Sequence, residues 1–181
     1  ASVYERSNEV TTAGAGIQLS PNANRVFSRI GLIDEVSALS RRCKGIKVFD
    51  YKSNSQLALF DYMKFKQDAA FLFCQRADLV GILYAACKKL KIPVHFDKKL
   101  EKITNGEVIF SDGNVYSADI IVGADGLHSN VRKALFDEET PIFTHQVAWR
   151  SIVPNSINQD DFSYVTLAPK RHLVSYPIND G

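Results

Sequence analysis

The sequence predicts an α/β protein in two parts, one that alternates strands with helices and one made of antiparallel strands. Three observations support this class. Amphipathic helical patterns cover residues 20–31 and 78–90. An apolar, β-branched run at 120–124 leads directly into a further helix, which is typical of a strand buried on both faces of a parallel sheet. Beyond residue 141 the chain alternates in strand-like segments without helical patterns between them.

Composition and charge narrow the class of protein. Of the 181 residues, 45% are hydrophobic and 23% are charged, which excludes intrinsic disorder, collagen and coiled coil. The net charge is only +2 and the basic residues are scattered, which argues against nucleic acid as a partner. No apolar run approaches the roughly 18 residues of a membrane span, and the N-terminus lacks a signal-peptide pattern. We therefore expect a cytoplasmic protein without an integral membrane segment.

The cysteines point to the same compartment. Cys43, Cys74 and Cys87 are odd in number and follow neither a C-x-x-C nor a His-paired spacing. A disulfide framework or a zinc site therefore has little support. We expect reduced, mostly buried thiols and no bound metal.

The first half of the chain begins with the end of a strand. Residues 2–6 indicate that strand, and residues 12–19 a loop of small residues. Ser20 is the expected N-cap and Pro21 the first residue of a helix that ends at Gly31. Further elements are expected as short strands at 46–49, 57–60 and 71–73, followed by a helix over 78–90 that begins just after Arg76.

The second half predicts a meander and then a return to the α/β pattern. Asn105-Gly106 is the strongest turn signal in the chain and predicts a β-hairpin over 100–110. Asp112-Gly113 turns the chain again toward a strand at 115–116. The run 120–124 is the expected buried strand, and a helix follows it through Phe136. Later strands are expected at 147–153, 164–167 and 172–178, in an antiparallel sheet of a second domain.

Three features can carry chemistry on the residues alone. Glu5 ends a strand, where a carboxylate can accept hydrogen bonds from ribose hydroxyls, although solvated Glu residues are common at strand ends. Asp125-Gly126 lies where a buried strand gives way to a helix, the place where ligands of open α/β sheets gather, and the alternative is a simple left-handed turn. Arg76 can pair with a pyrophosphate, and the alternative is a surface ion pair.

Three stretches together resemble one family. They read GAGIQLSPNA at 14–23, RADL at 76–79 and VGADGLHSNVR at 122–132. In this order and spacing they resemble the single-component FAD-dependent aromatic hydroxylases, the group that contains salicylate hydroxylase and kynurenine 3-monooxygenase. The resemblance runs from Val3 to about Gly181, and its third stretch is the most specific.

The resemblance implies an incomplete Rossmann-like FAD-binding domain with a β-meander and part of a substrate-binding domain. The FAD-binding domain would comprise residues 1–44 and 74–144 and lack its first βα unit. The substrate-binding part would comprise residues 45–73 and 145–181. We expect these residues to be the middle of a longer enzyme, so that the chain alone is inactive and does not hold FAD tightly.

The resemblance also assigns cofactor-binding roles to particular residues, while the catalytic residues remain unassigned. Glu5 and Arg6 would lie at the adenosine ribose and the adenine end of FAD, and the backbone of Leu100 would contact adenine. Asp125 and Gly126 would take part in FAD and NAD(P)H binding. Three further positions complete the set: Arg76 at the pyrophosphate and ribityl region, Arg132 holding the loop after Gly126, and Gln18 close to the cofactor.

The implied activity is that of an oxidoreductase. In this family NAD(P)H reduces the flavin, O2 adds to it, and one oxygen atom is delivered to an aromatic or quinol-type ring. The cofactor carries the difficult chemistry, so no Ser-His-Asp or paired-carboxylate arrangement is expected. The implied partners are a small aromatic substrate and O2, with a homodimer as the expected assembly.

Other functions remain open. The same fold serves quinone-pathway hydroxylases, epoxidases and flavin halogenases, and sequence outside these residues would separate them. A non-catalytic or degenerate flavoprotein-like fragment is a third hypothesis. A plain NAD-dependent dehydrogenase fits less well, because the Asp125-Gly126 stretch and the meander before it do not belong to the simple dinucleotide-binding pattern.

Overall fold

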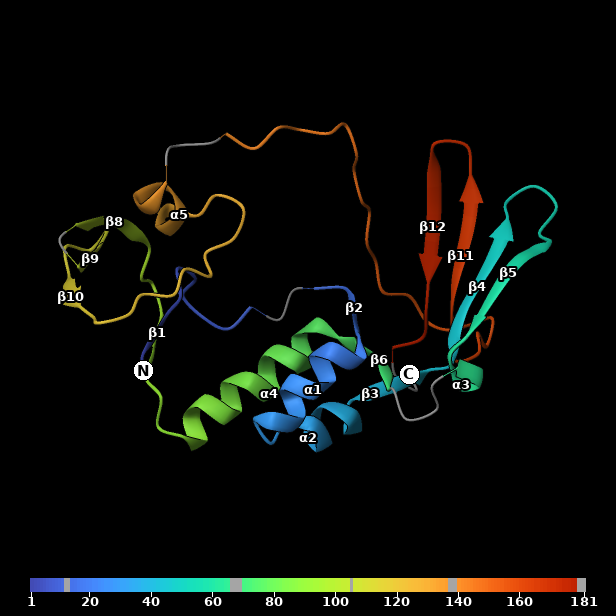
Figure 1. Cartoon of the computed structure of the whole chain (residues 1–181), viewed down its shortest axis with the longest axis horizontal. Helices are drawn as coiled ribbons and strands as arrows, with labels where there is room; N and C mark the ends of the chain where they lie inside the picture. The colour runs from blue at the N-terminus through green and yellow to red at the C-terminus, as the bar shows by residue number, and fades with distance from the viewer. Residues whose placement is uncertain (12–13, 66–69, 105, 137–139, 179–181) are drawn as a thin grey trace. The chain divides into compact units, whose positions relative to one another are not determined.

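The computed structural model describes residues 1–11, 14–65, 70–104, 106–136 and 140–178. The chain divides into two compact units (Figure 1). The first unit contains Ala1–Thr11 and Ala85–Trp149, and the second contains Thr12–Tyr84 and Arg150–Gly181. Helices and several sheets occur together, which confirms the predicted α/β class. The division into FAD-binding and substrate-binding domains stays a prediction.

In the first unit, a short parallel pair stands beside the predicted meander. Strand β1 (Val3–Tyr4) pairs in parallel with β7 (Val94–His95). The meander consists of β8 (Leu100–Thr104), β9 (Glu107–Phe110) and β10 (Val115–Ser117), all antiparallel. Both predicted turns are therefore confirmed as connections, although Asn105 itself lies outside the described residues.

Aromatic rings form the interior of this unit. The Tyr4 ring stacks on His95 and on Phe110, each with ring centroids 4.9 Å apart, and lies 5.1 Å from the ring of Tyr116. Phe110 is only 3% exposed. Because apolar burial supplies most of the stabilisation in a small sheet, these rings hold the two-residue strand β1 against the meander.

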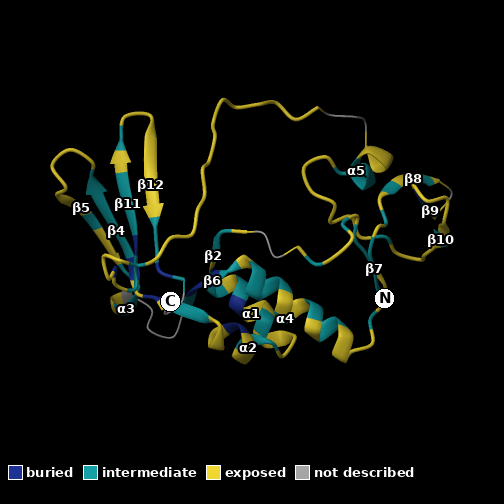
Figure 2. Cartoon of the chain, turned by 180° about the vertical axis from the view of Figure 1, so that it is seen from behind, coloured by how far each residue is buried: buried dark blue, intermediate teal, exposed yellow. Residues whose placement is uncertain are grey.

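Two predicted strands are not formed among the described residues. Residues 120–124 belong to no strand, with Ile120 82% and Val122 84% exposed. Residues 147–153 likewise belong to no strand, and Trp149 is 94% exposed. Figure 2 shows both stretches as exposed. A strand needs neighbours that satisfy its backbone groups, and an apolar β-branched pattern does not by itself provide them.

The second unit contains a layer of helices on a small antiparallel sheet. The sheet has the order β2 (Gly16–Leu19), β6 (Phe71–Gln75), β3 (Ser40–Cys43). Its core is made of Leu19, Val36, Leu72 and Cys74, with Phe27, Leu79 and Ile82 packed against them. The helices are α1 (Pro21–Arg29), α2 (Ile33–Ala38) and the part of α4 (Arg76–Lys89) up to Tyr84.

The helix prediction is confirmed for α1, and two local predictions need correction. Residues 16–19 form strand β2 instead of a loop, because their backbone pairs with β6. Helix α4 begins at Arg76, so this arginine is the first helical residue and does not precede the helix. Strand pairing therefore forms an element that the local pattern does not indicate, and the helix boundary differs by two residues from the predicted one.

A four-stranded sheet completes the second unit, in the order β12 (Arg171–Ser175), β11 (Phe162–Ala168), β4 (Gly45–Asp50), β5 (Gln56–Asp61). The hairpins β4–β5 and β11–β12 are antiparallel as expected. The central pair, β4 with β11, is parallel, so the sheet is mixed. The short helix α3 (Tyr62–Phe65) follows β5.

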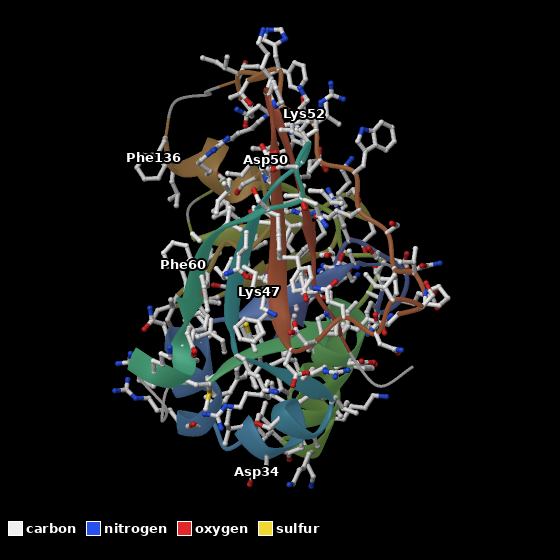
Figure 3. The ribbon with its side chains drawn as sticks, turned by 90° about the vertical axis from the view of Figure 1, so that its right-hand side faces the viewer. Asp34, Lys47, Asp50, Lys52, Phe60 and Phe136 are labelled. Carbon is white, nitrogen blue, oxygen red and sulfur yellow. The ribbon has the colours of Figure 1, made fainter. Side chains whose placement is uncertain are left out.

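Polar side chains from the 155–161 segment fix this sheet. Gln159 is 8% exposed, donates to the carbonyls of Phe162 and Ser175 at 3.0 Å each, and accepts the Ser175 hydroxyl at 2.9 Å. Lys47, labelled in Figure 3, forms an ion pair with Asp160 at 2.6 Å. The start of β11 is thereby tied to the end of β12 and to the centre of β4.

Candidate functional site

The loop after residue 124 is organised by the carboxylate of Asp125. Its Oδ1 accepts the hydroxyl of Ser129, and its Oδ2 accepts the backbone N–H groups of Asn130 at 2.7 Å and Val131 at 3.2 Å. Burial pushes the pKa of Asp125 upward, but these hydrogen bonds outweigh it and leave the pKa below its ordinary value. Asp125 is therefore ionised at neutral pH and accepts the first two N–H groups of helix α5 (Asn130–Leu135), while the N-cap Ser129 accepts the N–H of Arg132 at 3.0 Å.

Gly126 combines a left-handed backbone with open space. Its φ is +81°, and a Cβ placed there would meet nothing within 4 Å. The position is thus a left-handed turn, and its backbone is also accessible to a ligand. Arg132 Nη2 donates to the carbonyl of Leu127 at 3.2 Å, within this loop, and its role in holding the loop stays a prediction.

Sequence reasoning missed the requirement for glycine at position 123. A Cβ at Gly123 would lie 2.7 Å from Cβ and Cγ1 of Val131, closer than real Cβ atoms approach. The loop therefore passes directly over the first turn of α5. A glycine three residues before the predicted left-handed turn was the available signal.

Asn130 connects this loop to the meander, and sequence reasoning gave it no role. Its side-chain Nδ2 donates to the carbonyl of Leu100 at 2.6 Å. Its backbone N–H is bonded to Asp125, as described above. One residue thus touches two of the positions that the resemblance assigns to the cofactor.

Glu5 belongs to the same hydrogen-bonded frame. Its backbone N–H donates to His95, and its carbonyl accepts the N–H of Lys98 at 2.9 Å, two residues before Leu100. Its Oε1 accepts the N–H of Ser7 at 2.8 Å, and this bond is the main reason that the pKa of Glu5 is lowered. Glu5 is therefore a charged acceptor, and Arg6 beside it is exposed.

Gln18 and Arg76 both lie in the second unit, Gln18 in strand β2 and Arg76 at the start of helix α4. Gln18 is exposed on β2 opposite Phe73 of β6. Strand β6 runs directly into α4, where the N–H of Arg76 donates to the carbonyl of Ala15 at 3.2 Å. A Cβ at Gly14 would lie 3.1 Å from Cβ of Arg76, so the small-residue stretch allows a close approach to this arginine.

A second missed contact joins the same sheet to the residues after β12. A Cβ at Gly16 would lie 2.8 Å from Cε2 of Tyr176, and the Tyr176 ring stacks on Phe73 with centroids 4.7 Å apart. Burial raises the pKa of the Tyr176 phenol. The phenol is therefore neutral at physiological pH and can act as a hydrogen-bond donor.

The part of the chain that the structure describes holds no group of three or more His, Cys, Asp or Glu residues placed to bind a metal ion. Its helices are all too short or too polar to cross a membrane. Cys43 and Cys74 are free and buried, as expected, and Cys87 is half-buried.

Comparison with known proteins identifies relatives along nearly the whole chain, although no family model matches it. The chain is 30% identical over 191 residues to a 3-amino-4-hydroxybenzoate 2-monooxygenase of Streptomyces cremeus, which covers 99% of this chain and 48% of the relative. It is also 30% identical over 198 residues to the FAD-dependent monooxygenase OpS4 of Beauveria bassiana, with 99% of this chain and 46% of the relative covered.

The fold agrees with these relationships. The tetrameric form of 2-methyl-3-hydroxypyridine-5-carboxylic acid oxygenase matches 99% of this chain and 49% of that protein, with a TM-score of 0.80 and 22% identity. The chain spans about half the length of the curated relatives it matches. The chain is thus similar in sequence to monooxygenases, one of them FAD-dependent, along nearly its whole length, and similar in fold to an oxygenase.

Proposed function

We propose that these residues form part of a monooxygenase that uses FAD, NADH or NADPH, and O2 to hydroxylate an aromatic or quinol-type substrate. The observation that carries the proposal is the hydrogen-bonded frame of the first unit. It joins the backbone of Glu5 to Lys98, two residues before β8, and joins Leu100 through Asn130 to Asp125. Glu5, Leu100 and Asp125 are the positions in this frame at which the resemblance expects FAD.

The residues of this frame suit the adenosine end of FAD. A charged Glu5 can accept hydrogen bonds from ribose hydroxyls. The open backbone at Gly126 lets a ligand approach without meeting a side chain. Bound FAD would supply the redox chemistry with NAD(P)H and O2. The protein residues would bind and orient the cofactor: Glu5 and Arg6 at adenosine, Leu100 through its backbone, and Asp125, Gly126 and Arg132 through the loop.

Two further cofactor contacts remain predictions from the resemblance. The Arg76 guanidinium carries a fixed positive charge and suits the pyrophosphate of FAD, while Gln18 lies in the neighbouring strand. Residues 45–73 and 145–181 would supply part of the substrate-binding domain. A homodimer and a cytoplasmic location belong to the proposal, and the buried free thiols support that location.

The proposed substrate is a small aromatic compound, most simply a hydroxylated aromatic acid. Two of the related proteins carry such compounds in their names, an aminohydroxybenzoate and a hydroxypyridine carboxylic acid. An apolar pocket with a few placed polar groups would distinguish such rings.

The proposal is tested by flavin binding and by substrate-dependent turnover. FAD affinity is measured for the 181-residue chain and for any longer protein in which it occurs. The flavin-loaded protein is then given NADH or NADPH with a panel of hydroxylated aromatic acids and quinol precursors. We expect at least one compound to stimulate NAD(P)H consumption and to gain one oxygen atom by mass. Absence of flavin binding in every form of the protein would contradict the proposal.

A further inference from the structure

We propose that Asn130 is a positioning residue that fixes the Asp125–Gly126 loop against the first residue of β8. It would keep a constant spacing between the Leu100 backbone and the Asp125 loop, two places where FAD is proposed to bind. This inference rests on the proposed function. It assigns Asn130 no direct contact with the cofactor.

The geometry gives the two polar groups of Asn130 different tasks. Its backbone N–H donates to Asp125 Oδ2 at 2.7 Å, a bond that almost any residue at this position could make. Its side-chain Nδ2 donates to the carbonyl of Leu100 at 2.6 Å, across 30 residues of sequence. The side-chain amide is therefore the group that is specific to asparagine, and it forms the link to the meander.

The Leu100 carbonyl lies where the meander is irregular. The register between β8 and β9 shifts between Leu100 and Lys102. At such a shift the regular ladder is interrupted, and a backbone group is free to accept a side-chain donor. Asn130 bonds to β8 at this place, next to the Lys98 N–H that bonds to the Glu5 carbonyl. The amide therefore links the loop to the same stretch of chain that holds Glu5.

Helix α5 has few apolar contacts to hold it in place. It lies beside β8 (Figures 1 and 2), and none of its six residues is buried. Leu135 is 65% exposed, and Phe136, which follows the helix, is 69% exposed. Because so little apolar surface is buried here, one partly buried hydrogen bond represents a large share of what fixes the helix.

The hydrogen bond between the Asn130 side chain and the Leu100 carbonyl has a direct consequence for ligand binding. If the amide is removed, Asp125 still accepts the first N–H groups of α5, but the loop and helix can shift together relative to Leu100 and Glu5. A ligand that spans both places must then restore their spacing when it binds, and the cost of restoring it weakens its affinity. A residue that only supported the fold would instead lower stability without selectively weakening adenosine binding.

The test compares three variants of the purified protein: Asn130→Ala, Asn130→Gln and the control Asn22→Ala. Asn22 is an exposed asparagine in the first turn of α1, and its Oδ1 accepts from Arg25 at 2.9 Å. The measurements are the dissociation constants for FAD and for ADP, the melting temperature without ligand, and hydrogen exchange of the peptide that covers residues 125–132.

We expect Asn130→Ala to weaken FAD and ADP binding by about three- to tenfold, the size of one net hydrogen bond. Hydrogen exchange across 125–132 should become faster before any ligand is added. Asn130→Gln retains an amide donor and should recover part of the affinity. The control Asn22→Ala should bind as the unaltered protein does.

Two results would overturn the inference, and they are distinguishable. If the unaltered protein binds FAD and Asn130→Ala binds it equally well, the positioning role is wrong and the proposed function stands. If neither the 181-residue chain nor any longer protein that contains it binds FAD or ADP, the proposed function fails and the inference fails with it.

Discussion

Gly16 lies directly against the ring of Tyr176, with room for hydrogen only. A Cβ at position 16 would lie 2.8 Å from Tyr176 Cε2 and 2.9 Å from its hydroxyl oxygen. The Tyr176 ring also stacks on Phe73 of β6, with centroids 4.7 Å apart. The contact joins strand β2 to the chain that follows β12, and so connects the two sheets of the second unit.

This contact predicts that Gly16→Ala destabilises the protein by about 1–3 kcal/mol, because the added methyl group displaces the Tyr176 ring. The measurement is the free energy of unfolding in denaturant. Gly81→Ala is the matched control, since Gly81 lies in α4 with nothing within 4 Å of its added Cβ. The free energy of unfolding of the control variant should increase by about 0.5–1 kcal/mol. Equal effects of the two changes would contradict the Gly16–Tyr176 contact.

The buried amide of Gln159 predicts a second loss of stability. Gln159→Ala leaves the carbonyls of Phe162 and Ser175 without these donors and should cost about 1–3 kcal/mol. The same substitution at Gln56, an exposed residue at the start of β5, should change stability by less than about 0.5 kcal/mol. Chemical denaturation of both variants measures the difference. If Gln159→Ala left the free energy of unfolding unchanged, the 155–161 segment would not be what fixes the sheet.

The ion pair between Lys98 and Asp112 predicts a pH effect with a defined sign. The hydrogen bond from Lys98 lowers the pKa of Asp112 to about 2, below its ordinary value of 3.8. A carboxyl with a depressed pKa stabilises the folded state above its unfolded pKa, and that contribution is lost as the pH falls from about 4 toward about 2. An NMR titration of the Asp112 carboxyl should show the low value.

The matched variant for that titration is Lys98→Met, which keeps the length of the side chain without its charge. We expect the pKa of Asp112 to rise toward its ordinary value in this variant. The N–H of Asn114 still donates to Asp112 at 3.0 Å, so the return should be incomplete. An unchanged titration curve would show that Lys98 is not the cause of the shift.

The parts of the fold that the sequence predicted correctly depend on local chemistry. Ser20 and Pro21 mark the start of α1, although the Ser20 side chain makes no capping hydrogen bond, and Gly106 has a left-handed backbone between β8 and β9. Helix starts and tight turns depend on residues that are near one another in the sequence. The run 120–124 was predicted as a buried strand and is exposed instead. Its apolar pattern describes a strand that has neighbours, and pairing with neighbours is not a local property.

Some residues of the candidate site could likewise be predicted from the local sequence, and others could not. Glu5, Asp125 and Gly126 stand out in the sequence because strand ends and left-handed turns favour these residue types. Asn130 and Gly123 did not stand out, since their roles depend on Leu100 and Val131 reaching them in the folded chain. The contacts that position a loop are long-range, and the sequence pattern around Asn130 does not contain them.

The central claim is that the frame around Glu5 binds the adenosine half of FAD, and the most direct measurement is the dissociation constant for FAD of the unaltered protein and of Glu5→Gln. Glu9→Gln is the control, because Glu9 is exposed nearby and has no proposed role. Glu5→Gln replaces a charged acceptor with a neutral amide, so we expect FAD binding to weaken by about tenfold while the control binds normally. If the unaltered protein binds FAD and Glu5→Gln binds it with the same affinity, the adenosine site is not at Glu5, and the account of this frame is contradicted.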